Sequence, residues 1–116
     1  MSSETSQAIT SEEDLRAHLA QPGPVWLFKH SSSCGISTAA YDEYGNYLSA
    51  KPDQGAAHIV IQSHRPLSNL TAQILSRVHQ SPQLFLLANG EVLWAASHWS
   101  ITVAAMDKAW KDAQGS

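Results

Sequence analysis

Cysteine is almost absent from this sequence, because Cys34 is the only one among 116 residues. A lone thiol excludes an internal disulfide, which favours a reducing compartment, and we expect a cytoplasmic location. The six histidines do not combine with this cysteine in the paired spacing of a structural zinc site. We therefore expect no protein-bound metal and assign no metal ligands.

Positive charge and long apolar segments are also scarce. Seven Lys and Arg residues against ten Asp and Glu give a formal net charge of −3, and the basic residues form no cluster along the chain. This excludes the concentrated positive surface that nucleic acid binding needs. No apolar run is long enough to span a membrane, and residues 1–10 lack the basic and apolar regions of a secretory signal. We expect neither nucleic acid nor a membrane as a partner.

The length of the chain suits one domain. We expect a flexible polar N-terminus over residues 1–10 and a single folded domain over residues 11–116. Two continuous apolar runs, residues 25–28 and 58–61, are typical of strands buried on both faces. A helical pattern from Cys34 to Leu48 joins them, which predicts a right-handed crossover between parallel strands.

The second half of the chain predicts a hairpin flanked by helices. Residues 84–87 and 91–96 form two further strand patterns, and Asn89-Gly90 between them favours a type I′ turn. The other helices are expected from an N-cap at Ser11 to Ala20, from Arg65 to Val78, and from an N-cap at Ser100 to Lys111. This order predicts an α/β protein with the thioredoxin fold, in which helices flank a central four-stranded mixed sheet.

Cys34 stands where the first predicted strand gives way to the second helix. Unpaired N–H groups and the positive end of the helix dipole favour a thiolate at such a position. The serines and glycine around it suit a turn better than a core, which argues against a buried structural cysteine. Ser37 occupies the place where a dithiol oxidoreductase carries its second cysteine. The pattern predicts a catalytic thiol that exchanges with an outside partner.

Side chains near this thiol have two interpretations each. The hydroxyl of Ser37 can donate a hydrogen bond to the thiolate or can be a plain first-turn serine. His30 can polarise the thiol, or it can be a surface histidine at a strand end. Lys29 either supports the thiolate as a nearby cation or only solvates the end of the strand. The residues assigned to support the site are Ser33, Gly35, Ile36, Ser37 and His30.

A second loop is expected to face the thiol. In the thioredoxin fold the loop before residues 84–87 lies across the carboxyl edge of the sheet, where open α/β sheets bind ligands. It ends in Ser81-Pro82, for which we predict a cis peptide bond. His98-Trp99 follows the last strand at this edge, so Trp99 either shapes the groove for a small thiol or peptide, or packs ordinarily. The residues assigned to substrate binding are Ser81, Pro82, His98 and Trp99.

These motifs resemble those of the monothiol bacilliredoxins of the YtxJ type, which are small thioredoxin-like proteins linked to bacillithiol. The resemblance runs from about Val25 to Trp110, and its most specific part is the run Ser-His-Trp-Ser-Ile-Thr that ends at Thr102. The other matching segments are Phe28-Lys29-His30-Ser31, Ser33-Cys34-Gly35-Ile36-Ser37, Ser81-Pro82-Gln83 and Asn89-Gly90-Glu91-Val92. Gly35 departs from the pattern, because many relatives carry proline there.

The resemblance implies an enzyme, a thiol–disulfide oxidoreductase that removes bacillithiol from client proteins by a monothiol mechanism. Cys34 attacks the bacillithiol sulfur of the mixed disulfide, releases the client cysteine and itself becomes bacillithiolated. A second low-molecular-weight thiol then regenerates Cys34. The implied partners are bacillithiolated client proteins and this small thiol. Bacillithiol is a co-substrate, and no tightly bound cofactor is implied.

Two other functions stay open from the residues alone. The run Cys34-Gly35-Ile36-Ser37 also resembles the Cys-Gly-Phe-Ser site of monothiol glutaredoxins that carry an iron–sulfur cluster between two subunits. One cysteine per chain cannot supply four thiolates, so such a carrier needs a dimer and small-thiol ligands. The third hypothesis is a non-catalytic thioredoxin-like interaction module with an unreactive cysteine.

Overall fold

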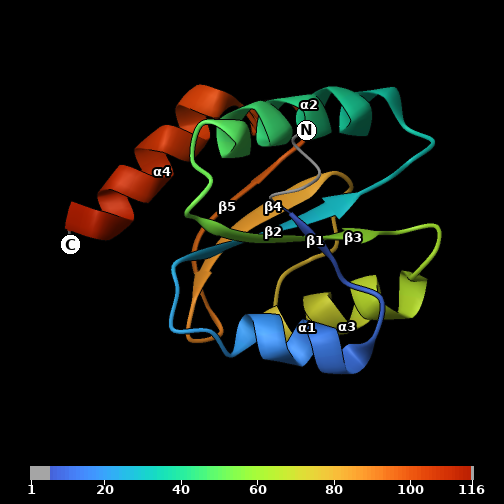
Figure 1. Ribbon diagram of the computed structural model, residues 1–116. Helices are drawn as coiled ribbons and strands as arrows, with labels where there is room; N and C mark the ends of the chain where they lie inside the picture. Colours follow the sequence, from blue (N-terminus) through green and yellow to red (C-terminus); the bar gives the residue numbers. More distant parts are fainter. Residues whose placement is uncertain (1–5, 116) are drawn as a thin grey trace.

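A five-stranded mixed sheet forms the centre of the computed structural model, which describes residues 6–115 (Figure 1). The order across the sheet is β1-β3-β2-β4-β5. Strands β1, β3 and β2 run parallel to one another, whereas β4 is antiparallel to β2 and to β5. The strand bounds are β1 Gln7–Ala8, β2 Val25–His30, β3 Gly55–Val60, β4 Gln83–Ala88 and β5 Glu91–Ser97. The predicted parallel crossover followed by a hairpin is confirmed.

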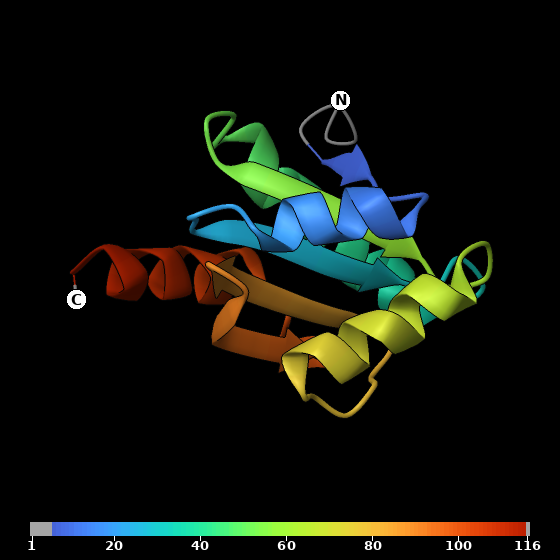
Figure 2. The same cartoon turned by 90° about the horizontal axis from the view of Figure 1, so that it is seen from below.

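Helices cover both faces of this sheet, with α2 and α4 on one face and α1 and α3 on the other (Figures 1 and 2). Side chains alternate along a strand, so β2 contributes to both cores. Trp26 and Phe28 pack in the core on the α2 and α4 side, whereas Val25 and Leu27 pack in the core on the α1 and α3 side. The helix bounds are α1 Glu12–Leu19, α2 Gly35–Ser49, α3 Arg65–Leu75, the 3₁₀ helix η2 His98–Ser100 and α4 Val103–Gly115. None of the helices in residues 6–115 has the length and apolarity to cross a membrane.

The N-terminal segment differs from the expectation. We predicted four strands and a flexible stretch over residues 1–10, but Gln7 and Ala8 form a fifth strand on the outer edge of β3. The N–H of Ile9 donates to the carbonyl oxygen of His58 at 2.9 Å, and only 2% of Ile9 is exposed. The sheet therefore has five strands instead of the predicted four, because the edge of β3 offers hydrogen-bonding groups that a two-residue strand satisfies. Residues 1–5 lie outside the described residues.

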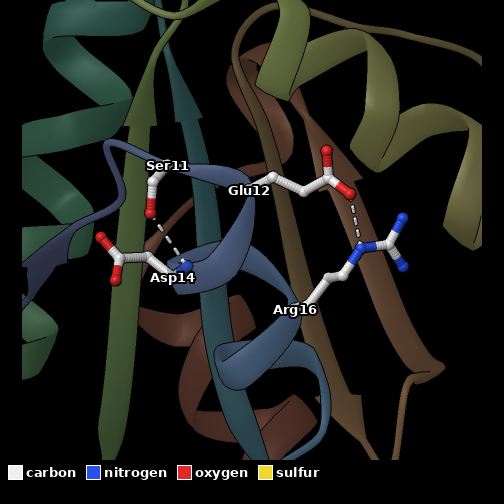
Figure 3. Close-up of polar contacts among 4 residues, drawn as sticks. All are labelled: Ser11, Glu12, Asp14 and Arg16. Carbon is white, nitrogen blue, oxygen red and sulfur yellow. Dashed lines mark hydrogen bonds and ion pairs between the residues drawn. The ribbon is translucent and has the colours of Figure 1, made fainter.

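Helix α1 begins where the sequence predicts. The hydroxyl of Ser11 accepts a hydrogen bond from the N–H of Asp14 at 3.1 Å, which is the contact of an N-cap and contributes about 1 kcal/mol (Figure 3). On the same turn the guanidinium of Arg16 pairs with the carboxylate of Glu12 at 2.8 Å (Figure 3). Both of these side chains are exposed, so the ion pair adds little to stability. The cap rather than the ion pair fixes the start of α1.

Two predicted helix boundaries were wrong. Helix α3 ends at Leu75 because Ser76 adopts a left-handed conformation with φ of 54°, so Val78 is 81% exposed instead of facing the core. Ser100 lies in η2 and does not cap α4. The hydroxyl of Thr102 takes that role by accepting from the N–H of Ala105 at 3.1 Å.

The two backbone features predicted at the ends of β4, the cis peptide bond before it and the hairpin turn after it, are confirmed. Asn89 and Gly90 have φ values of 53° and 78°, as a type I′ hairpin requires. The Ser81–Pro82 peptide bond is cis, and so is Gly23–Pro24, which we did not predict.

Candidate active site

The thiol of Cys34 stands at the junction of β2 and α2. Cys34 is the N-cap residue of α2, has an extended backbone with φ of −113° and is partly exposed. Its N–H donates to the carbonyl oxygen of Ser31 at 3.3 Å, and its own carbonyl accepts from the N–H of Thr38 at 3.0 Å. The sulfur makes no capping hydrogen bond with the described backbone of α2. The unpaired N–H groups at the start of α2 therefore lie beside a sulfur that makes no capping hydrogen bond with them.

Ser37 is fully buried one turn into α2. Its Oγ accepts the N–H of Ser31 at 2.9 Å and is hydrogen-bonded to Nδ1 of His30 at 2.8 Å. These two contacts tie the end of β2 to the first turn of α2, so Ser37 holds the loop that carries Cys34. The position that a second cysteine would occupy is filled by a hydrogen-bonded hydroxyl, which cannot resolve a mixed disulfide.

The serine loop before Cys34 is held by Gln62, a residue that the sequence did not identify. The Nε2 of Gln62 donates to the hydroxyls of Ser31 at 2.7 Å and of Ser33 at 2.9 Å. Its Oε1 accepts from the N–H of Ser32 at 3.0 Å and from the hydroxyl of Ser32 at 3.2 Å. Gln62 follows β3 at the carboxyl end of the sheet, and this location was the only signal that pointed to it. One amide side chain therefore fixes all three serines.

His30 is partly buried and is not the surface histidine of the simpler interpretation. Its ring stacks on Tyr41 with a centroid distance of 4.6 Å and an interplanar angle of 23°. His58 also packs against Tyr41, with a centroid distance of 5.8 Å and an interplanar angle of 71°. Burial lowers the pKa of His30, and it raises the pKa of Tyr41. The imidazole is therefore mainly neutral at pH 7, with Nδ1 turned to Ser37.

The interpretation that Lys29 only solvates the end of β2 is wrong, because Lys29 is buried. Its side chain is fully buried on the opposite face of the sheet from His30, and Nζ has no hydrogen-bond partner among the described residues. Burial lowers the pKa of Lys29 to about 8. Its strand neighbour on β4 is Gln83, whose side chain holds the preceding loop. Gln83 Nε2 donates to the carbonyl oxygen of Val78 and Gln83 Oε1 accepts from the N–H of Gln80, both at 3.2 Å. An amine without a partner thus lies beneath the loop that ends in Pro82.

The cis-proline loop and the end of β5 meet at the same edge. Gln83 pairs with Lys29 on one side and with Ser97 on the other, so Pro82 lies between His30 and His98 at this edge of the sheet. The N–H of His98 donates to the carbonyl oxygen of Pro82 at 3.2 Å. His98 has a φ of 54°, a left-handed conformation that non-glycine residues rarely adopt. Pro82 and His98 therefore form one connected wall beside the loop of Cys34.

A pocket of about 240 Å³ opens between α2 and this wall. Trp99 is 70% exposed over it, so the interpretation of ordinary packing for this residue is wrong. Glu43 lies at the pocket and accepts the N–H of Val103 at 2.9 Å, which joins α2 to the start of α4. The lining residues are Ala39, Ala40, Glu43, His98, Trp99, Ile101 and Thr102. Glu43 was missed by the sequence analysis, because nothing in its local pattern separates it from an ordinary helix residue.

The remaining predicted site residues, which are Gly35 and Ile36 beside the thiol and Ser81 of the substrate-binding set, make no side-chain hydrogen bond with the described residues. Gly35 is exposed, and a Cβ placed on it would meet no described atom within 4 Å. Ile36 and Ser81 are partly buried. Within residues 6–115, no three His, Cys, Asp or Glu side chains come together as a potential metal site.

The comparisons with known proteins agree with this geometry. The family model described as monothiol bacilliredoxin BrxC matches residues 7–106. A solved structure described as a candidate oxidoreductase with a thioredoxin fold has 28% sequence identity and a TM-score of 0.85, over 94% of this chain and 96% of that one. Mitochondrial thioredoxin 3 from Saccharomyces cerevisiae is 15% identical with a TM-score of 0.75, over 97% and 99% of the two chains. Thioredoxin from Trypanosoma brucei brucei is 13% identical with a TM-score of 0.76, over 96% and 92%. The predicted thioredoxin fold is confirmed.

Proposed function

Because the chain belongs to the monothiol bacilliredoxin family, whose thioredoxin fold serves thiol redox chemistry, we propose that it removes bacillithiol from the mixed disulfides of client proteins. The observation that carries this proposal is the pairing of one partly exposed thiol with a buried Ser37. A site of this kind forms a mixed disulfide and depends on an outside thiol to resolve it.

The reaction proceeds by two exchange steps at one sulfur. The Cys34 thiolate attacks the bacillithiol sulfur of the mixed disulfide, a new disulfide forms, and the client cysteine leaves as a thiolate that takes up a proton. A second low-molecular-weight thiol, in thiolate form, then attacks the bacillithiol sulfur on Cys34. This releases a small disulfide and restores Cys34. Bacillithiol is a co-substrate in this cycle, which we place in the cytoplasm and which requires no tightly bound cofactor.

The groove beside Cys34 supports a partner during these steps. Pro82 and His98 form one wall, and the pocket beneath Trp99 begins at Ala39, about one and a half helical turns after Cys34 along α2. The extended backbone before β4 offers a partner chain an edge to align with, and the pocket offers apolar surface for the group attached to the sulfur. Both surfaces bind the substrate while its disulfide lies next to Cys34.

Mass spectrometry tests this proposal directly. The protein is mixed with oxidised bacillithiol and, separately, with glutathione disulfide, and the Cys34→Ala variant is treated in the same way. We expect a fast bacillithiol adduct on the wild type, a slower glutathione adduct and neither adduct on Cys34→Ala. Equal rates with both disulfides would contradict the substrate assignment, and no adduct with either would contradict exchange at Cys34. In the latter case, a coloured protein after anaerobic purification would favour the cluster carrier.

A further inference from the structure

One acidic side chain, that of Glu43, lines the pocket between α2 and the segment that follows β5. Its Oε1 accepts the N–H of Val103 at 2.9 Å, whereas Oε2 has no hydrogen-bond partner among residues 6–115. Glu43 also forms no ion pair with the described Lys, Arg and His side chains. A backbone N–H offsets only part of a carboxylate charge, so the pocket contains a negative charge that no cation of the described chain neutralises.

The remaining walls of the pocket suit a cation on an apolar stem. Trp99 is 70% exposed over the pocket, and an indole ring attracts a cation placed over its face. Ala39, Ala40 and Ile101 supply small apolar surface, against which the methylene groups of a long basic side chain can pack. The pocket thus combines an apolar wall, an exposed indole and a carboxylate.

The size of the pocket favours a single side chain over a whole small molecule. Its volume of about 240 Å³ lies below the range of roughly 300–1,000 Å³ that is usual for small-molecule sites. Helices α2 and α4 cover the same face of the sheet, and the bond from Glu43 to Val103 joins them at the inner end of the pocket (Figure 1).

The position of the pocket along α2 indicates which part of a mixed disulfide reaches it. With a rise of about 1.5 Å per residue, Ala39 lies about 8 Å and Glu43 about 14 Å from Cys34 along the helix axis. A charge next to the reacting sulfur is too close to Cys34 to meet Glu43. An extended client chain advances about 3.3 Å per residue, so a long side chain about two or three residues from the client cysteine does reach it.

We propose that this pocket binds a lysine or arginine side chain of the client protein, about two or three residues from the client cysteine that carries the mixed disulfide. The stem of the basic residue packs on Ala39, Ala40 and Ile101, and its charge lies between Trp99 and the free oxygen of Glu43. The inference rests on the proposed exchange at Cys34 and names the class of client that reacts fastest. Glu43 and Trp99 are specificity residues and take no part in the bond exchange itself.

A set of short peptides tests this preference. Each peptide carries one cysteine as a mixed disulfide with nitrothiobenzoate, and lysine stands two residues before or two residues after the cysteine. The matched peptides carry norleucine, which keeps the stem without the charge, or carry the lysine eight residues away. The Cys34 thiolate attacks the peptide sulfur, a disulfide between Cys34 and the peptide forms, and nitrothiobenzoate leaves as a coloured thiolate that reports the rate.

We expect the wild type to react about fivefold faster with a nearby lysine than with norleucine. Glu43→Gln should remove this preference, because the amide loses the charge but keeps an oxygen for the N–H of Val103. Asp42→Asn, at the adjacent exposed position of α2, is the matched control and should keep the preference. Equal rates for lysine and norleucine would overturn the inference. So would a preference that Glu43→Gln retains, or one that is as strong when the lysine is eight residues away.

Binding of a peptide with serine in place of cysteine tests the pocket without any exchange. The indole N–H signal of Trp99 in a nuclear magnetic resonance spectrum, identified by its loss in Trp99→Phe, should move with the lysine peptide and much less with the norleucine peptide. An equal movement with both peptides would overturn the inference. A lysine preference together with no exchange of bacillithiol would contradict the proposed function alone, whereas bacillithiol exchange without a lysine preference would contradict this inference alone.

Discussion

The Oγ of Ser33, the residue before the reactive thiol, accepts a hydrogen bond from Nε2 of Gln62 at 2.9 Å. Gln62 belongs to the segment after β3, so the loop of Cys34 is held from the neighbouring strand as well as from its own helix. This contact belongs to a set of four that Gln62 makes with Ser31, Ser32 and Ser33.

Replacement of Gln62 by Leu should loosen this loop. Leucine keeps a similar volume but removes all four contacts, so the N–H of Ser32 should exchange with solvent faster. We expect a loss of about 1 kcal/mol in the free energy of unfolding, because the contacts are largely exposed, and a clear fall in the rate of adduct formation at Cys34. Gln73→Leu on the exposed side of α3 is the control. An unchanged exchange rate for Ser32 would show that Gln62 does not order the loop.

Replacement of Lys29 by Met should stabilise the protein. Burial lowers the pKa of Lys29 from its ordinary value of 10.5 to about 8 in the folded state, so protonation favours the unfolded chain. The resulting cost is fully present below about pH 8 and disappears as pH rises toward about 10.5. This cost is about 3 kcal/mol, and methionine fills the same space without a charge.

Urea unfolding of the wild type and Lys29→Met, measured from about pH 7 to about pH 10, checks this result. The difference in free energy of unfolding should be largest at the neutral end and shrink with rising pH. Lys108→Met, at an exposed position of α4, is the control. A variant that is less stable than the wild type at pH 7 would mean that the ammonium has a stabilising role in the folded protein.

Replacement of Trp99 by Ala should weaken substrate binding but leave the fold intact. Trp99 is 70% exposed, so we expect the free energy of unfolding to change by less than about 0.5 kcal/mol. The KM for a bacillithiolated client should rise, because the indole borders the pocket beside the thiol. Val78→Ala, at another strongly exposed apolar position, should leave KM unchanged. Equal KM values for wild type and Trp99→Ala would exclude Trp99 from the groove.

Replacement of Gly35 by Pro should be accepted and should stabilise the start of α2. Gly35 is the first helical residue, where proline loses no intrahelical hydrogen bond, and no described atom lies within 4 Å of a Cβ placed there. We expect a gain of about 0.5 kcal/mol in the free energy of unfolding, through a less mobile unfolded chain. Gly23→Ala provides the contrast, because its Cβ would lie 2.5 Å from the carbonyl oxygen of Leu87 and its φ is +72°. A melting temperature lowered by Gly35→Pro would contradict this reasoning.

Much of the fold follows from apolar pattern, and the exceptions have physical causes. The runs at residues 25–28 and 84–87 predicted buried strands because their side chains fill both faces of the sheet. Strand β1 has no such pattern, since Gln7 and Ala8 pair through backbone groups alone and their side chains are exposed. Val78 continued a helical pattern that the left-handed backbone of Ser76 interrupts.

The candidate site was predictable where it depends on local sequence. The place of Cys34 at the start of α2 and the cis bond before Pro82 followed from neighbouring residues. Gln62 and Glu43 could not be found in this way, because their contacts join segments 29 to 60 residues apart in the chain. The burial of Lys29 was missed for a different reason, since a charged residue at a strand end is ordinarily exposed.

The most direct test of the central claim is the release of bacillithiol from a client protein that carries it as a mixed disulfide. The protein is added in catalytic amount with free bacillithiol, and the free client thiol is followed with time. The account predicts many turnovers for the wild type, none above background for Cys34→Ala, and accumulation of a bacillithiol adduct on Cys34 when the free thiol is left out. Equal release by Cys34→Ala and the wild type would contradict it.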